Sequence, residues 1–224
     1  MKKFALAIDG PSGAGKSSIA KTLSKKLGIV YVDTGAIYRT VGLYVHRKGI
    51  DSKDKENIIS LLNDISIKLA YVDNAQHIYL NGEDVSDKIR TEIISKYASD
   101  VSAIPEVRSF LLALQRNMAK ENSVVMDGRD IGTVVLPDAD VKVYLTASAE
   151  VRADRRYKEL LAKGENVTFD SVLEAINLRD KNDSSRATAP LKPADDAIIL
   201  DNSDLTAEQT LNKFVEIIES RLGE

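Results

Sequence analysis

Short apolar runs and amphipathic stretches alternate along this chain. The run Phe4–Ile8 ends at Asp9 and a glycine-proline pair, which predicts a buried strand entering a turn. From Lys16 onward, apolar residues recur every four positions as far as Leu27, and Gly28 stands where a helix-closing glycine belongs. A strand, a glycine-rich turn and a helix in immediate succession predict that the chain opens as an α/β fold.

The rest of the chain continues this alternation. Further strands are predicted over 29–32, 124–126, 141–145 and 197–200. Helical spacing of apolar residues predicts helices over about 36–48, from Pro105 onward, over about 148–161, around 169–176, and from the capping box Thr206–Gln209 to the end of the chain. Five strands separated by helices predict a parallel sheet.

The interval between the second and third predicted strands is about ninety residues, far more than a crossover helix needs. Within it, apolar and polar residues alternate over 65–71, Asp73-Asn74 indicates a turn, and Asn81-Gly82 is a strong hairpin signal. We therefore predict a small antiparallel β-meander inserted at 63–100. The core then consists of 1–62 and 101–224.

Composition narrows the function classes. Of 224 residues, 43% are hydrophobic and 29% charged, as in folded globular proteins. The net charge of −3 gives duplex nucleic acid no overall attraction, so we expect no nucleic-acid partner. The absence of cysteine excludes disulfides, thiolate zinc sites and cysteine nucleophiles. Phe4–Ile8 is too short for a signal peptide or a membrane span, so we expect a cytoplasmic protein with no membrane partner.

The first turn carries a phosphate-binding motif. The pattern G-x-x-x-x-G-K-[ST] is matched at every fixed position from Gly10 to Ser17, directly between a predicted strand and a predicted helix. In such a loop, backbone N–H groups cradle phosphates, Lys16 reaches the β and γ oxygens, and Ser17 holds Mg²⁺. The expected ATP-binding residues are Gly10, Pro11, Ser12, Gly13, Ala14, Gly15, Lys16, Ser17 and Ser18.

Two other segments are candidates for the second site. Asp33–Arg39 follows the second strand and Asp127–Asp130 follows the third, and ligands bind at the carboxyl ends of parallel strands. We therefore expect both to face the phosphate-binding loop. Asp127 has two interpretations: a hydrogen-bonding partner of that loop or of a magnesium-bound water, or a residue of the second site. A guanine-reading N-K-x-D is missing, which excludes a switch GTPase.

Arginines gather in and beside these turns. They are Arg39, Arg108, Arg129, Arg179 and Arg186, with a further group, Arg152, Arg155 and Arg156, after the fourth strand. Guanidinium groups pair bidentately with phosphates, so this clustering favours a site for two polyphosphate groups. The spacing of Arg179, Asp183 and Arg186 predicts one helical face. The polar stretch from Arg179 to Pro193 predicts a mobile lid, within a lid region of about 152–193, that excludes water from the transfer.

Together these motifs resemble the bacterial cytidylate kinases of the long form. The resemblance runs almost from end to end and rests on Ile8–Lys16, Asp33–Arg39, Asp127–Asp130, Gly132–Val135 and Arg186–Leu191. It implies a P-loop nucleoside monophosphate kinase fold with strand order 2-3-1-4-5, in which the insert binds the monophosphate. It also implies transfer from ATP with Mg²⁺ to CMP or dCMP, in a monomer.

The resemblance also implies roles for individual residues. It puts cytosine near Ser99, Arg108 and Asp130, the acceptor phosphate on Arg39, Arg129 and Arg186, and the sugar near Thr34, Arg179 and Asp183. Charge on the transferred group falls to Lys16, Mg²⁺ and the lid arginines, with Arg155 and Arg156 preferred over Arg152. Where this chain has Ser17-Ser18, many relatives have Gly-Thr, so either hydroxyl is a candidate magnesium ligand.

Two other functions remain open on the sequence. A kinase for a small hydroxyl substrate such as shikimate needs a carboxylate base, and Asp33 occupies a suitable place. A P-loop binding module or RNA-associated ATPase would form no phosphorylated small product. Net charge and the lack of aromatic residues within a basic run disfavour that class.

Overall fold

The structure is a computed structural model that describes residues 3–72 and 75–223. The turn predicted at Asp73-Asn74 lies outside the described residues. The chain divides into two compact units, Met1–Val30 with Asn122–Glu224, and Tyr31–Glu121.

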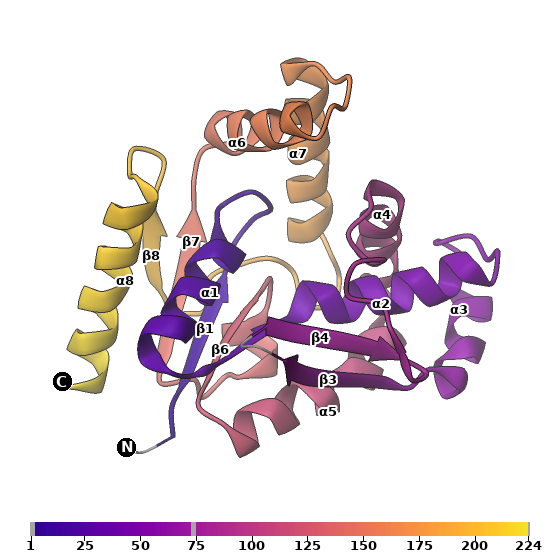
Figure 1. The fold of residues 1–224 in the computed structure, drawn as a ribbon, viewed down its shortest axis with the longest axis horizontal. Coiled ribbons are helices and arrows are strands. Elements are labelled where there is room, and N and C mark those ends of the chain that lie inside the picture. Colours follow the sequence, from indigo (N-terminus) through magenta and orange to yellow (C-terminus); the bar gives the residue numbers. More distant parts are fainter. Residues whose placement is uncertain (1–2, 73–74, 224) are drawn as a thin grey trace. The chain divides into compact units, whose positions relative to one another are not determined.

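Five strands form one parallel sheet (Figure 1). Its strands, in spatial order, are β2 (Val30–Asp33), β6 (Val124–Gly128), β1 (Ala5–Asp9), β7 (Val141–Thr146) and β8 (Ile198–Asp201). This confirms the parallel sheet predicted from the apolar runs and the order 2-3-1-4-5 implied by the resemblance. Strand β1 pairs in parallel with both β6 and β7, which explains why it is a continuous apolar run with almost every side chain buried.

The first unit adds four α-helices and a short π-helix to this sheet. They are α1 (Lys16–Leu27), η2 (Ile131–Val135, the π-helix), α6 (Ala149–Ala162), α7 (Phe169–Ser184) and α8 (Ala207–Leu222). Gly28 closes α1 in the left-handed conformation at φ 64°, and Thr206 opens α8 with the predicted capping box. Buried residues of α6 and α7, among them Leu160 and Ile176, pack into one apolar cluster.

The end of α7 differs from the predicted helical face. Arg179 and Asp183 lie on the helix, but α7 ends at Ser184, so Arg186 lies beyond it. Beyond the helix, the backbone is left-handed at Ala189, φ 50°, immediately before Pro190. The N–H of Leu191 then donates to the carbonyl of Asp183 at 2.8 Å, which folds this segment back onto the helix.

The second unit contains the predicted meander. Strands β3 (Ile67–Val72), β4 (Ala75–Leu80) and β5 (Glu83–Asp84) form an antiparallel sheet in that order. Asn81 and Gly82, at φ 51° and 88°, make the tight turn between β4 and β5 that the Asn-Gly pair predicts. The helical elements are α2 (Thr34–Arg47), α3 (Lys55–Leu61), the 3-10 turn η1 (Leu62–Asp64), α4 (Glu92–Val101) and α5 (Pro105–Glu121). The sequence pattern did not predict α3 and α4.

This unit is wider than the insert expected at 63–100, because α2 and α5 belong to it as well. Helix α2 packs closely against α4, and the contact depends on Gly42. A Cβ at Gly42 would lie 2.9 Å from the backbone nitrogen of Ala98. None of the helices in the described part of the chain is both long and apolar enough to cross a membrane.

Candidate active site

The phosphate-binding loop joins β1 to α1 and needs its glycines for steric reasons. Gly10 has φ 145°, and a Cβ there would lie 1.9 Å from the carbonyl oxygen of Leu145 in β7. Gly13 has φ 79°, and its Cβ would lie 3.1 Å from Cβ of Arg152. The loop therefore passes against neighbouring backbone so closely that only glycine fits at Gly10.

Lys16 is buried at the first position of α1, and its Nζ donates to the carbonyl of Pro11 at 2.7 Å. Burial lowers the pKa of the Lys16 ammonium well below its ordinary value. The neighbouring charges of Arg129 and Arg179 lower it further, while those of Asp127 and Asp9 oppose the shift. A buried ammonium repelled by two guanidiniums is stabilised by an added anion, which is what a polyphosphate supplies.

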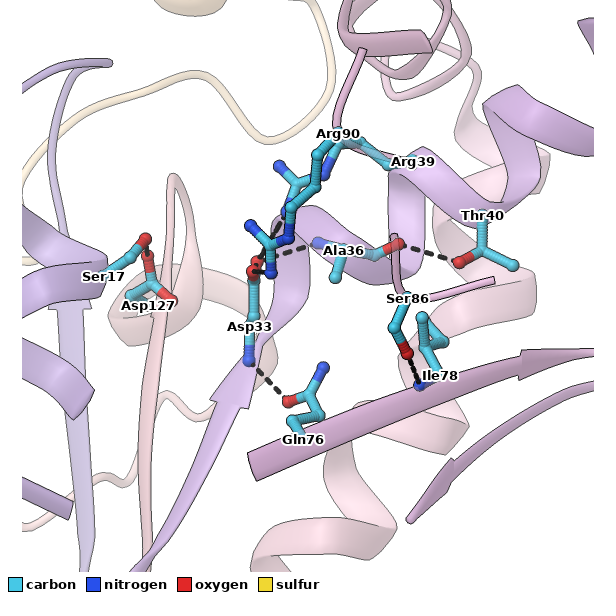
Figure 2. A network of polar contacts seen from close by, with 10 residues as sticks. All are labelled: Ser17, Asp33, Ala36, Arg39, Thr40, Gln76, Ile78, Ser86, Arg90 and Asp127. Atoms are coloured by element: carbon cyan, nitrogen blue, oxygen red, sulfur yellow. Dashed lines mark hydrogen bonds and ion pairs between the residues drawn. The ribbon is translucent and has the colours of Figure 1, made fainter. Parts of the chain in front are cut away.

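Ser17 and Asp127 form an oxygen pair beside this lysine. The Ser17 Oγ donates to Oδ2 of Asp127 at 2.8 Å, from the start of α1 to the end of β6 (Figure 2). The first of the two interpretations of Asp127, a hydrogen bond to the phosphate-binding loop, is therefore observed. A hydroxyl and a carboxylate suit Mg²⁺, which takes few protein oxygens and completes its shell with phosphates and water. The residues present fit that ion.

Asp9, at the end of β1, holds the start of the π-helix η2. It is 4% exposed and accepts the N–H groups of Ile131 and Gly132, both at 2.7 Å. These two peptides directly follow Asp130, so Asp9 fixes the backbone beside that residue. Burial raises the pKa of Asp9 to about 6, although the two N–H groups partly counter the shift.

The raised pKa of Asp9 predicts a pH dependence of stability. Because the folded state holds this proton more tightly than the unfolded chain, Asp9 stabilises the fold most below pH 4, and the contribution is lost as pH rises through about 6. Asp9→Asn cannot titrate at this position and serves as the reference. Between pH 4 and pH 7, the unfolding free energy of the native protein should fall by about 2 kcal/mol more than that of the variant. Urea denaturation at both pH values measures this, and a difference that does not change with pH would contradict it.

Asp183 brings two of the predicted arginines together. It is 1% exposed, accepts Nε of Arg129 at 2.8 Å, and also accepts Nη2 of Arg186. Burial alone would raise the pKa of its carboxyl, but Arg129 and Arg186 outweigh this and lower it, so the group is ionised. The first unit thus joins Arg129 and Arg186 through one ionised carboxylate, and the charge of Arg129 also acts on Lys16 in the phosphate-binding loop.

The arginines of α6 differ in what they contact. Arg152, the residue not preferred from the sequence, is buried and donates to the carbonyls of Ala147, at 2.9 Å, and Ser12, at 3.2 Å. Its third nitrogen pairs with Asp180 on α7 at 2.7 Å. Arg152 therefore connects the phosphate-binding loop to the helix that carries Arg179.

The two preferred arginines lie differently from each other. Arg155 donates to the side chain and carbonyl of Asn202, at 3.1 and 3.0 Å, and Asn202 donates to the carbonyl of Ala14 in the loop at 3.0 Å. Arg156 pairs with Glu159 at 2.9 Å on the exposed face of α6. Arg155 is thus connected to the loop through Asn202, whereas Arg156 lies on the helix surface. Their assignment to the transferred group stays a prediction.

In the second unit, the end of β2 and the start of α2 carry a dense polar network (Figure 2). Asp33 is the N-cap of α2 and accepts the N–H of Ala36 at 2.8 Å. It also accepts Nη2 of Arg39 at 3.0 and 3.2 Å. Thr34 is buried next to it. The sequence had singled out Arg39 and Thr34 but gave Asp33 only a base role in a rival reaction.

The predicted base-binding residues of this unit lie on α4 and α5. Arg108 is buried, donates to the carbonyl of Ser102 at 3.1 Å and lies 5.5 Å from the ring centre of Tyr38. The Ser102 hydroxyl in turn donates to the carbonyl of Ser99 at 2.8 Å. The structure therefore connects Ser99 and Arg108 within one unit. Asp130, the third predicted base contact, lies buried in the first unit.

Several polar residues of the site were not found from the sequence. Asp9 and Asn202 lie at the carboxyl ends of β1 and β8, so the rule that ligands bind at that edge of a sheet could have identified them. Gln76 and Arg90, which contact Asp33 in the second unit, stand in a strand and a loop with no local motif. Only the fold brings them there.

Sequence comparison with known proteins finds one family that matches this chain over almost its whole length. The sequence model of the cytidylate kinase family matches residues 6–220. A cytidylate kinase of Caldicellulosiruptor saccharolyticus is 50% identical over 223 residues, covering 100% of this chain and 99% of its own length. That of Caldanaerobacter subterraneus subsp. tengcongensis is 51% identical over 213 residues, covering 95% of this chain and 93% of its own length. In fold, the chain is similar to an uncharacterized protein from Eubacterium ventriosum, with a TM-score of 0.52 at 13% identity, covering 98% of this chain and 100% of that one.

Proposed function

The chain belongs to the cytidylate kinase family, and we propose that it transfers the γ-phosphoryl group of ATP to the phosphate of CMP or dCMP, giving CDP or dCDP. The similarity to cytidylate kinases along the whole chain carries this proposal. The buried Lys16 in its glycine-rich loop supports ATP as the phosphoryl donor, because such loops bind polyphosphates. From the family resemblance we also expect a cytoplasmic monomer.

The chemistry of this transfer relies on positioning and charge. A nucleotide phosphate is largely ionised near neutral pH, so it attacks the γ-phosphorus without a general base. Lys16, Arg129 and Arg186 supply positive charge to the transferring group and the acceptor, and Asp183 holds the two guanidiniums in place. Ser17 and Asp127 are the residues that would hold Mg²⁺, which neutralises charge on the phosphate oxygens when bound.

The sugar is assigned to Thr34, Arg179 and Asp183. Asp183 already accepts two guanidinium donors, but a carboxylate offers about four acceptor positions, so a ribose hydroxyl can be a further donor. The base is assigned to Ser99, Arg108 and Asp130. Cytosine has an exocyclic amine that donates to a carboxylate, whereas uracil has an oxygen at that position and is repelled by it.

This assignment predicts the effect of Asp130→Asn. An amide accepts from the cytosine amine less strongly and can donate to the uracil oxygen, so the ratio of kcat/KM for CMP to that for UMP should fall about 10- to 100-fold. Steady-state kinetics with both nucleotides measure the ratio. Asp138→Asn, which changes an exposed carboxylate beyond η2, is the matched control and should leave the ratio unchanged. An unchanged ratio in Asp130→Asn would remove Asp130 from base recognition.

A coupled assay of ADP formation from ATP with CMP, dCMP, UMP, AMP and shikimate tests the function as a whole. We expect rapid turnover with CMP and dCMP and slow turnover with UMP. Turnover with none of the monophosphates would refute the proposal. Turnover with shikimate alone would favour the hydroxyl kinase with Asp33 as base, and ATP hydrolysis without a phosphorylated product would favour the binding module.

A further inference from the structure

Two guanidinium groups share one buried carboxylate at the end of β2. Asp33 is 5% exposed, and its Oδ2 lies 3.0 Å from Nη2 of Arg39 and 3.5 Å from Nη2 of Arg90 (Figure 2). Arg39 comes from α2, and Arg90 from the segment between β5 and α4, 57 residues away from Asp33 in sequence. Two cations on one anion leave a net positive charge at this point.

Asp33 is held in one geometry by contacts on both sides. Its Oδ1 accepts the N–H of Ala36 at 2.8 Å, and its own backbone N–H donates to Oε1 of Gln76 at 2.9 Å. Because the carboxylate is held in this way, it cannot shift toward one of the two arginines and lose its contact with the other. It therefore fixes the positions of both guanidiniums.

Gly35 makes room for this arrangement. A Cβ there would lie 3.0 Å from Nη1 of Arg39 and 3.2 Å from Oδ1 of Asp33, so a larger residue would displace the guanidinium. The Nε of Arg39 is buried and has no hydrogen-bond acceptor among the residues that the structure describes. A buried donor of this kind requires an acceptor, because leaving it unsatisfied is costly. An anion beside Arg39 would provide one.

The geometry points to Arg90 as a further arginine that binds the acceptor's phosphate, next to Arg39, with Asp33 as the residue that positions both. The inference rests on the proposed function for the identity of the ligand, a nucleoside monophosphate. Its chemistry follows from the charges: a phosphate monoester carries up to two negative charges and accepts hydrogen bonds from two planar guanidiniums at once. Arg90 is about half exposed, so the N–H groups that it does not direct at Asp33 can donate to an incoming phosphate while the ion pair is kept.

The test compares Arg90→Gln with Arg47→Gln in the full-length protein. Arg47 lies on α2 in the same unit and makes a closer ion pair than Arg90 does, with Glu83 at 2.7 Å, but it is not placed at the site. We expect Arg90→Gln to raise KM and the calorimetric Kd for CMP about tenfold, with KM for ATP within about twofold. Affinity for cytidine, which lacks the phosphate, should not change. Arg47→Gln should match the native protein throughout.

The possible results separate the explanations. Equal weakening of CMP and cytidine would show that Arg90 supports the unit rather than the phosphate and would overturn the inference. If the affinities for CMP and cytidine were both unchanged, the contact between Arg90 and Asp33 would be a surface ion pair without a role in binding. This result would also overturn the inference. If the native protein turned over no CMP at all, the proposed function would fail. Loss of CMP binding but not cytidine binding in Arg90→Gln would still support the phosphate site.

Asp33→Asn tests the positioning role separately. The amide oxygen can still cap α2, but the charge that holds two guanidiniums is gone, so KM for CMP should rise about tenfold with a smaller change in kcat. A loss of kcat of about a hundredfold or more at unchanged KM would instead identify Asp33 as a base and overturn its positioning role. Thermal unfolding of the variant verifies that the helix cap is kept.

Discussion

Replacing Lys16 with Met is expected to lower kcat/KM for CMP about a thousandfold while leaving the protein at least as stable as before. The ammonium is the cation that the phosphate-binding loop presents to the β and γ oxygens, and removing such a preorganised charge costs about two to three orders of magnitude in rate. Without ATP, however, burial lowers the pKa of Lys16, and the charges of Arg129 and Arg179 lower it further. Methionine of similar length removes that repulsion, so the melting temperature should stay the same or rise.

Steady-state kinetics and thermal unfolding of the same preparation measure both effects. Lys21→Met is the matched control, because Lys21 is an exposed lysine on the same helix. It should leave both kinetics and stability unchanged. A variant at Lys16 that keeps native kcat/KM would remove the lysine from the transfer, and one that loses both activity and stability would show that its role is structural.

Replacing Asp183 with Ala should reduce both stability and activity. The substitution leaves the guanidiniums of Arg129 and Arg186 close together without the carboxylate that both contact. Breaking a buried ion pair from one side typically costs about 3–5 kcal/mol, because the remaining charge is left uncompensated. Since the same arginines are assigned to the acceptor phosphate, kcat/KM for CMP should fall at least about a hundredfold.

Urea denaturation and steady-state kinetics test this expectation. Glu174→Ala changes an exposed carboxylate on the same helix and should alter neither quantity by much. Asp183→Asn keeps hydrogen-bond acceptance but loses the charge, so it should fall between the native protein and the alanine variant. If Asp183→Ala unfolded with native free energy, the two arginines would have to find other partners, and the proposed arrangement around Asp183 would be wrong.

The sequence by itself determined the features that are encoded within a few residues. The apolar run before Asp9, the glycines of the loop, the left-handed Gly28 and the capping box at Thr206 each follow from local sterics and hydrogen bonding. These signals predicted the parallel strands and the P-loop. The Asn81-Gly82 pair likewise predicted the turn between β4 and β5.

Only the tertiary structure decided which distant side chains meet. Asp9 holds residues 122 and 123 positions away, and Arg90 reaches Asp33 across 57 positions. Arg152 rather than Arg156 contacts the loop because α6 turns that face toward Ser12. Such pairings carry no local periodicity. They depend on the packing of whole elements, which is why they emerge only once the sheet and its helices are in place.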